Sequence, residues 1–233
     1  MIDLHIHSKY SFDSLLPPRT ILKVAKKKGL TGIAVTDHNT IRGGLEVRKI
    51  NKNRDFTVIV GCEIQTEIGD IIGLYLNDEI KSHVSIEVIE EIKIQGGVVV
   101  LPHPFRGHKL NQYIIEQSDA IEVFNSRSTT EENTKSLELA KRYNKPFTAG
   151  SDAHFAAEIG SAYVSTNVRS AEGSKKRIFT DAVEVHGQQS PRYFMDASQA
   201  IKSLEKKEYL QSTQHMIHFL YHVLKTKSHE RKI

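Results

Sequence analysis

The 233-residue sequence predicts an α/β fold in which helices cover a mainly parallel sheet. Two observations support this fold class: short apolar runs alternate with helical patterns along the chain, and the runs are rich in β-branched residues. The number of alternating units favours a closed barrel, although an open sheet also agrees with the pattern. No shift in composition marks a boundary, so we expect a single domain over residues 1–233.

The expected strands are apolar runs of four to seven residues that lie between turn or helix signals. The run VVVL at 98–101 has the composition of a buried strand. Residues two apart on a strand share a face, which matters for the polar residues that follow these runs. The runs are Ile2–His7, Thr31–Thr36, Phe56–Val60, Asp70–Leu76, Val98–Leu101, Ala120–Phe124 and Pro146–Ala149.

Helices are expected where start and stop signals frame a helical pattern. One follows the pair Pro17 and Pro18, and a second covers residues 85–95 ahead of two glycines. A third begins at Thr129, which has a glutamate three residues later, as in a capping box. From about 197 to 233 we expect a terminal helix that ends in a basic tail.

Composition limits the function classes and the compartment. The net charge of +4 and a pI of about 9.0 suit phosphorylated ligands, including nucleic acid. No apolar stretch approaches the roughly 18 to 20 residues of a membrane span, and the first residues do not form a secretory signal. The single cysteine, Cys62, cannot form an internal disulfide, which fits a reducing compartment. We therefore expect a cytoplasmic protein without a membrane partner.

Histidines and carboxylates follow nearly every expected strand. The carboxyl ends of barrel strands share one rim, so these side chains should meet in space. Each residue alone is more often structural, since a lone His forms hydrogen bonds and a lone Asp caps helices. Their coincidence at the same end of successive strands favours metal binding instead. The candidates are His5, His7, Asp13, His38, Glu63, His103, Asp152 and His154.

The number and type of these ligands limit the metals. Eight candidates are too many for one zinc-like ion, which takes about four protein ligands, and are enough for two or three ions. Imidazole and carboxylate donors without thiolate favour Zn, Mn or Fe. Cys62 is adjacent to Glu63 and should therefore face the opposite side of an extended segment, in the core.

Five short motifs occur in a fixed order between residues 3 and 154: DLHIHS, TDHNT, GCE, PHPF and GSDAH. In this order they resemble the successive motifs of the PHP (polymerase and histidinol phosphatase) family. The resemblance implies a distorted, seven-stranded β/α barrel of the TIM-like kind with a trinuclear metal site. It also implies phosphoesterase activity that depends on those metals.

The resemblance further implies how the ligands are shared among the metals. His5, His7, Glu63 and Asp152 would hold one ion. Glu63 would bridge it to a second ion that His103 also binds. Asp13, His38 and His154 would hold the third.

One position departs from the family pattern. Many members carry a further histidine ahead of an apolar-Gly pair on the strand after the bridging glutamate, and here Asp70 occupies that position. Asp70 is either a replacement ligand or a turn residue after Gly69. The nearby His83 has the setting of a loop residue.

The expected reaction is hydrolysis of a phosphate ester of a small molecule, such as a nucleotide or a phosphorylated metabolite. Divalent metals lower the pKa of a water between them, which supplies hydroxide near neutral pH. Glu63, as the bridge, and His154, as a group that assists the leaving oxygen, are the catalytic candidates. Arg106 and Arg127 follow strands and could bind the phosphate, because a guanidinium suits bidentate contacts; the alternative is an ordinary surface arginine.

Two other functions remain as alternatives. A PHP-type nuclease acting on nucleic acid ends would need a basic groove with stacking aromatics, whereas this sequence has no Trp and its basic residues are dispersed along the chain. A non-catalytic barrel subunit of a nucleoprotein should have lost ligands, whereas this chain retains nearly the full set.

Overall fold

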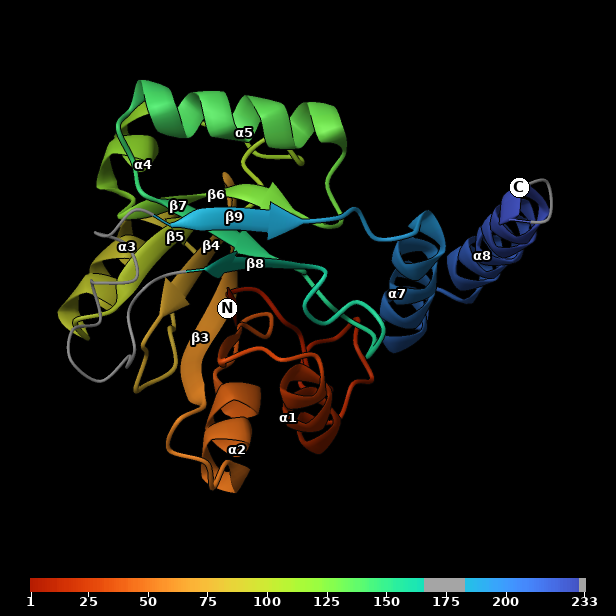
Figure 1. Ribbon diagram of the computed structural model, residues 1–233. Helices are drawn as coiled ribbons and strands as arrows, with labels where there is room; N and C mark the ends of the chain where they lie inside the picture. Colours follow the sequence, from red (N-terminus) through yellow and green to blue (C-terminus); the bar gives the residue numbers. More distant parts are fainter. Residues whose placement is uncertain (166–182, 231–233) are drawn as a thin grey trace.

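The structure is a computed structural model that describes residues 1–165 and 183–230. Its strands form one nine-stranded sheet in the order β7-β6-β5-β4-β3-β2-β1-β8-β9, which curls into a nearly closed barrel (Figure 1). The strands are β1 (Ile2–Asp3), β2 (Gly32–Val35), β3 (Thr57–Thr66), β4 (Gly69–Leu74), β5 (Val98–Leu101), β6 (Ala120–Asn125), β7 (Phe147–Gly150), β8 (Ala162–Ser165) and β9 (Glu184–Gly187).

The barrel is closed by backbone hydrogen bonds between the segments that follow β1 and β7. The N–H of Leu4 donates to the carbonyl of Ala149 at 3.3 Å. Further along, the N–H of Asp152 donates to the carbonyl of His5 at 2.8 Å, and that of His7 to Ala153 at 2.9 Å. This seam, Leu4–His7 against Ala149–Ala153, joins the beginning of the chain to the seventh strand.

The expected count of seven strands is not confirmed, because β8 and β9 add two. β8 pairs with β1 in antiparallel orientation, and β9 pairs with β8 in the same way. β8 alternates between buried and half-buried residues, and β9 is largely half-buried or exposed, so neither has the continuous apolar run that marks the other strands.

The sheet is mixed, not mainly parallel, since four of its eight strand pairs are antiparallel. The expected third strand continues six residues past Val60 to Thr66, and a turn at Glu67 and Ile68 leads directly into β4. So short a connection can join only antiparallel strands. β4 consequently runs against both β3 and β5.

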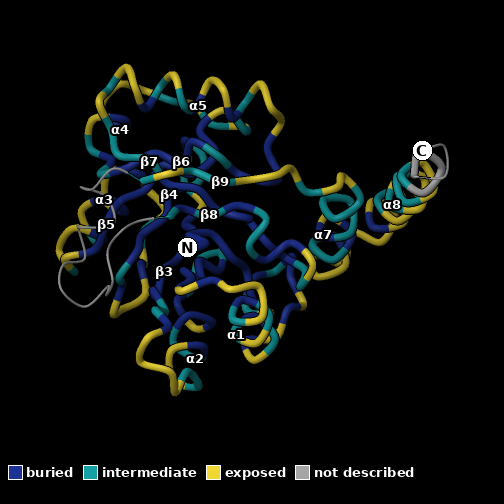
Figure 2. Tube along the Cα trace, viewed as in Figure 1, coloured by how far each residue is buried: buried dark blue, intermediate teal, exposed yellow. Residues whose placement is uncertain are grey.

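The helices up to residue 142 lie around the outside of the barrel, with exposed residues on their outer sides (Figure 2). The three helices expected before residue 145 are present, and two short ones, α2 and α4, were not anticipated. Thr129 and Glu132 form the expected capping box at the start of α5. The helices are α1 (Pro18–Lys27), α2 (Arg42–Ile50), α3 (Ser85–Ile94), α4 (Gln112–Gln117), α5 (Thr130–Arg142), α7 (Arg192–Glu205) and α8 (Tyr209–Glu230).

The C-terminal region contains two helices where one was expected from about residue 197. α7 begins earlier, directly after the extended residue Pro191, and ends near Lys207, whose φ of 61° breaks the helical path. α8 packs against α7 and extends away from the barrel (Figure 1). None of the helices in the described part of the chain has the length and apolar character needed to cross a membrane.

The barrel interior is filled by one buried cluster with side chains from β1 to β8, which supports the strand ends from below. Its members are Ile2, Leu4, Ala34, Ile59, Ile72, Leu74, Val98, Val100, Ala120, Ala149, Ala162 and Val164. A second cluster lies between the sheet and α3 to α5 and includes Cys62, which is 1% exposed, as the sequence predicts.

Candidate metal centre

The predicted ligands converge at one rim of the barrel. His5 and His7 lie on the segment after β1, and Asp152 and His154 lie on the segment after β7, so the seam places these pairs side by side. His38 forms an isolated bridge with Glu63, which brings those two together. Glu63 lies inside β3 and not after it, because the strand is longer than predicted. All eight are buried except His38, which is half-buried.

The donor atoms form three overlapping groups, within each of which all atoms lie within 4.8 Å of one another. His5 and His7 each belong to two of the groups, so neighbouring groups have an imidazole in common. These groups resemble the sets that the family resemblance implies. They are His7, Asp13, His38 and His154; His5, Glu63 and His103; and His5, His7 and Asp152.

The two carboxylate oxygens of Glu63 face different imidazoles. Its Oε1 lies 2.9 Å from His103 Nε2. Its Oε2 lies 3.3 Å from His5 Nε2 and 3.2 Å from His7 Nε2. A carboxylate placed in this way is suited to bridge two cations.

Hydrogen bonding shows that the site fits cations. His5 Nδ1 lies 3.0 Å from Glu122 Oε1, which can only accept when ionised, so the ring proton is on Nδ1 and Nε2 carries a lone pair. His7 Nδ1 lies 2.9 Å from Ser11 Oγ, which donates its own proton to Asp37 Oδ1 at 3.2 Å and therefore accepts from Nδ1, so the Nε2 of His7 is the atom turned toward His5. The two Nε2 atoms are 3.0 Å apart, so either a proton or a metal ion has to lie between them.

Further buried polar atoms of the candidate ligands form no hydrogen bond with the described residues. Asp13 Oδ1 and the Nδ1 atoms of His38 and His103 accept or donate no hydrogen bond among the residues that the structure describes. Burial opposes a charge on His7, but hydrogen bonds to Asp152 and Glu63 outweigh it and raise the pKa of His7 to about 10. The surrounding carboxylates therefore favour positive charge at this position, which is what a divalent ion supplies.

A second layer of polar residues orients the ligands, and sequence reasoning missed its central member, Glu122. Besides His5, Glu122 accepts from the N–H of His103 at 2.9 Å and from Asn125 Nδ2 at 3.0 Å. Partners of this kind fix the tautomer and orientation of metal-binding histidines. The signal was present in the sequence, because a glutamate interrupts the apolar run of β6 and is 2% exposed.

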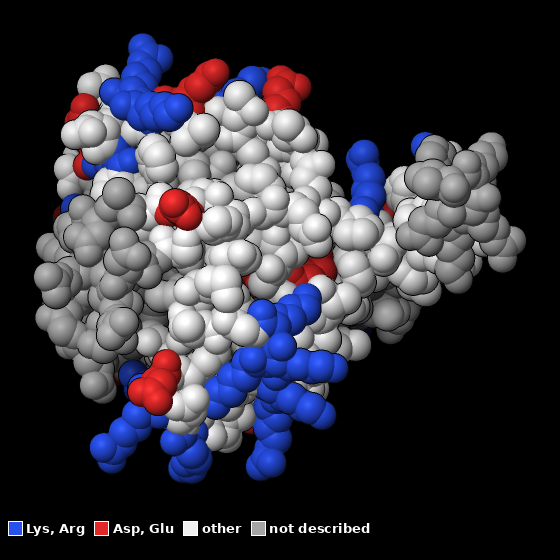
Figure 3. Space-filling model, in the orientation of Figure 1, with Lys and Arg blue, Asp and Glu red and all other residues white. Residues whose placement is uncertain are grey.

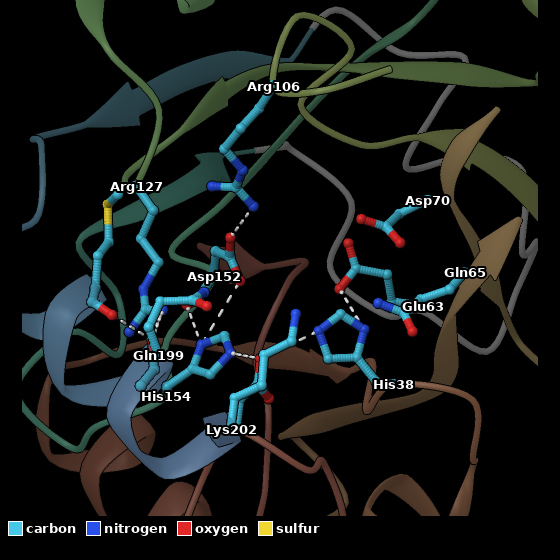
Figure 4. A pocket seen from close by; sticks show the side chains of 13 residues that line it. His38, Glu63, Gln65, Asp70, Arg106, Arg127, Asp152, His154, Gln199 and Lys202 are labelled. Carbon is cyan, nitrogen blue, oxygen red and sulfur yellow. Dashed lines mark hydrogen bonds and ion pairs between the residues drawn. The ribbon is translucent and has the colours of Figure 1, made fainter. Parts of the chain in front are cut away.

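The sequence left two interpretations for Asp70, a replacement ligand or a turn residue. The structure shows that it is not a turn residue, because it lies in a strand. It lies in β4, opposite Gln65, and the turn is formed by the residues before Gly69. Its side chain lines the same pocket as Glu63 (Figure 4) but belongs to none of the three donor groups. His83 lies in an exposed loop, where its Nδ1 contacts the carbonyl of Gln65 at 2.9 Å.

Arg106 and Arg127 both line the pocket but differ in their contacts. Arg106 is 31% exposed and donates to Asp152 Oδ2 at 2.6 Å. Arg127 is 8% exposed and forms a bidentate pair with Glu158, at 2.9 and 2.7 Å, and donates to Ser198 Oγ at 2.9 Å. Three of the five donor hydrogens of Arg127 are thus engaged within the protein. Its geometry is that of a structural arginine.

Replacing Arg127 with Met should therefore affect stability more than substrate binding. The variant leaves the carboxylate of Glu158 buried and unpaired, which costs about 3–5 kcal/mol of unfolding free energy. Urea denaturation measures this, and the double variant Arg127→Met/Glu158→Gln should recover part of the loss. A variant of unchanged stability that shows only a raised KM for a phosphate ester would contradict this role and support substrate binding.

Helix α7 completes the pocket, which sequence reasoning did not anticipate because the motifs end at residue 154. Met195, Ser198, Gln199 and Lys202 of this helix line it, and Figure 4 shows Gln199 and Lys202 close to His154. The cavity is about 200 Å³. It has room for a phosphate group and a few attached atoms.

Comparisons with known proteins agree with the fold. Residues 130–175 match a family model described as PHP-associated. An uncharacterized protein of Methanocaldococcus jannaschii is 48% identical over 138 residues, covering 53% of this chain and 81% of the relative. A second uncharacterized protein of that organism is 37% identical over 175 residues, covering 70% of this chain and 69% of the relative.

Among solved structures, a two-domain protein from Bacteroides vulgatus superposes with a TM-score of 0.68 at 18% identity, covering 84% of this chain and 68% of that one. That protein is described as containing a predicted PHP-like metal-dependent phosphoesterase. The barrel fold is thus shared with that protein, and the rim of the barrel in this chain carries clustered imidazoles and carboxylates. The chain belongs to the PHP family.

Proposed function

We propose that this protein is a metal-dependent phosphoesterase that hydrolyses phosphomonoesters of a small molecule, either a nucleotide or a phosphorylated metabolite. The observation that carries the proposal is the position of the three donor groups, which border a small pocket that also contains Arg106 and Lys202. Acidic and imidazole donors suit Zn, Mn or Fe, and the cations suit the oxygens of a phosphate.

The residues divide into holding and orienting roles. Two or three divalent ions held by His5, His7, Asp13, His38, Glu63, His103, Asp152 and His154 would lower the pKa of a water and polarise the phosphate. Glu122 holds the His5 ring in place. Asp70 stays a candidate for a further ligand.

His154 is better suited to hold a metal than to donate a proton. Its Nδ1 lies 2.8 Å from the carbonyl oxygen of Asp152, which can only accept, so the ring proton is on Nδ1. When the imidazole is neutral, its Nε2 atom, which lies 3.1 Å from Asp13 Oδ2, carries a lone pair that can bind a metal ion. Assistance to the leaving oxygen would therefore come from the ion that His154 holds.

A substrate screen tests the proposal. Protein loaded with Mn²⁺ or Zn²⁺ is incubated with a panel of mononucleotides, sugar phosphates and other phosphorylated metabolites, and released inorganic phosphate is measured. We expect release from at least one small phosphomonoester, and none after chelation. Loaded protein that releases no phosphate from any member of the panel would contradict the proposal.

A specific observation favours the nuclease as a second candidate function. The basic residues, which are dispersed in the sequence, gather on one face over α1 and α2 (Figure 3). A groove there is lined by Arg19, Lys23, Lys26, Lys49 and Lys52, together with Leu22 and Ile50. Such a face would attract a polynucleotide backbone. Digestion of single-stranded oligonucleotides without phosphate release from mononucleotides would support this function instead.

A further inference from the structure

The pocket contains three cationic side chains, and they differ in how their charge is balanced. Arg106 pairs with Asp152, and Arg127 pairs with Glu158. Lys202 has no carboxylate oxygen within 4.0 Å of its ammonium group among the described residues. Lys202 is half-buried, so its charge is less well hydrated than that of a surface lysine.

The position of Lys202 is set by contacts on both sides. Its Nζ lies 5.1 Å from the centre of the Phe12 ring, and that ring stacks on His38 at 4.6 Å with an interplanar angle of 9°. The side chain reaches from α7 toward the space between His38 and His154 (Figure 4). The ammonium group is thereby aimed at the donor groups.

Helix α7, which carries Lys202, is tied to the barrel close to the pocket. Ser198 accepts a hydrogen bond from Arg127, and Phe194 stacks on Phe155 with ring centres 5.5 Å apart. The helix therefore presents Lys202 from a supported position and not from a free terminus.

We propose that Lys202 is a substrate-binding residue whose ammonium group contacts an oxygen of the phosphate bound in this pocket. An ammonium beside a group of metal-binding side chains would face repulsion when the ions are bound, and an anion between them removes it. This inference deepens the proposed function and rests on it for the identity of the anion. It makes α7, outside the motif region 3–154, part of the substrate site.

Binding of inorganic phosphate to the metal-loaded protein tests Lys202 without relying on turnover. Lys202→Met keeps the apolar stem over Phe12 and removes the charge. Calorimetry should show a Kd for phosphate about 10- to 100-fold higher than that of the wild type, as expected for loss of one hydrogen bond to a charged group. Lys206→Met, an exposed position at the end of the same helix, is the matched control and should bind phosphate like the wild type.

Metal content and thermal unfolding of both variants should match the wild type, which shows that neither folding nor the metal centre has changed. Equal phosphate affinity in Lys202→Met and Lys206→Met would overturn the inference, and so would a wild-type protein that binds no phosphate. A lower affinity in Lys202→Met together with no phosphate release in the substrate screen would uphold the role of Lys202 and overturn the phosphomonoesterase proposal alone.

Discussion

Removal of divalent metal should lower the melting temperature of the protein by about 5–15 °C and abolish phosphate release. Ions bound at 100 to 1,000 times their Kd add roughly 3–4 kcal/mol of stability, which corresponds to a shift of this size in a chain of this length. The physical reason is the set of buried imidazole nitrogens and carboxylates that converge on each other, including the Nε2 atoms of His5 and His7.

The measurement combines elemental analysis with thermal unfolding before and after chelation. We expect two or three ions per chain in the loaded protein, as the ligand count predicts. Added Mn²⁺ or Zn²⁺ should restore both stability and activity, which separates metal loss from damage by the chelator. A protein that contains no metal even after incubation with these ions, and that melts at the same temperature with and without chelator, would contradict the metal centre itself.

Replacing Glu63 with Gln should lower kcat by on the order of a hundredfold or more. Its two carboxylate oxygens face different imidazoles, one toward His103 and the other toward His5 and His7. An amide keeps the shape but offers one neutral oxygen and an NH₂ group that cannot bind a cation. Two ions should then bind more weakly, and the effect should fall on the chemical step more than on substrate affinity.

Kinetics at saturating metal and elemental analysis measure the consequences of Glu63→Gln. Glu131→Gln, an exposed acid on α5, is the control and should leave kcat unchanged. The variant should still fold, because the barrel interior is built from apolar strand residues. Near-normal turnover with full metal content would show that Glu63 supports the site without bridging ions.

The sequence predicts those features that depend on local pattern. Val98–Leu101 is a strand with the bounds expected from its apolar run, and the Thr129 capping box forms as its spacing indicates. The ligands were found because each follows or belongs to a strand and strand ends meet on one rim. Both kinds of inference need only the neighbouring residues and a general rule for barrels.

The remaining features depend on contacts that are distant in the chain. The apolar run predicted only the first part of β3, because polar residues such as Glu63 and Gln65 follow it. These polar residues nevertheless pair with β4 and extend the strand. Glu122 matters because His5 is its partner 117 residues away. Lys202 lines the pocket because α7 packs beside the rim of the barrel. The local sequence of a polar helix does not predict where that helix packs.

The seam between Leu4–His7 and Ala149–Ala153 has a consequence for synthesis of the protein on the ribosome. His5 and His7 are synthesised well before their partner Asp152, which follows after nearly 150 further residues. A contact so distant along the chain forms late in folding. An unfinished chain that stops before Asp152 therefore holds an open barrel with an incomplete set of donors. Selection of the correct metal thus falls to the finished polypeptide and to the ions available at that moment.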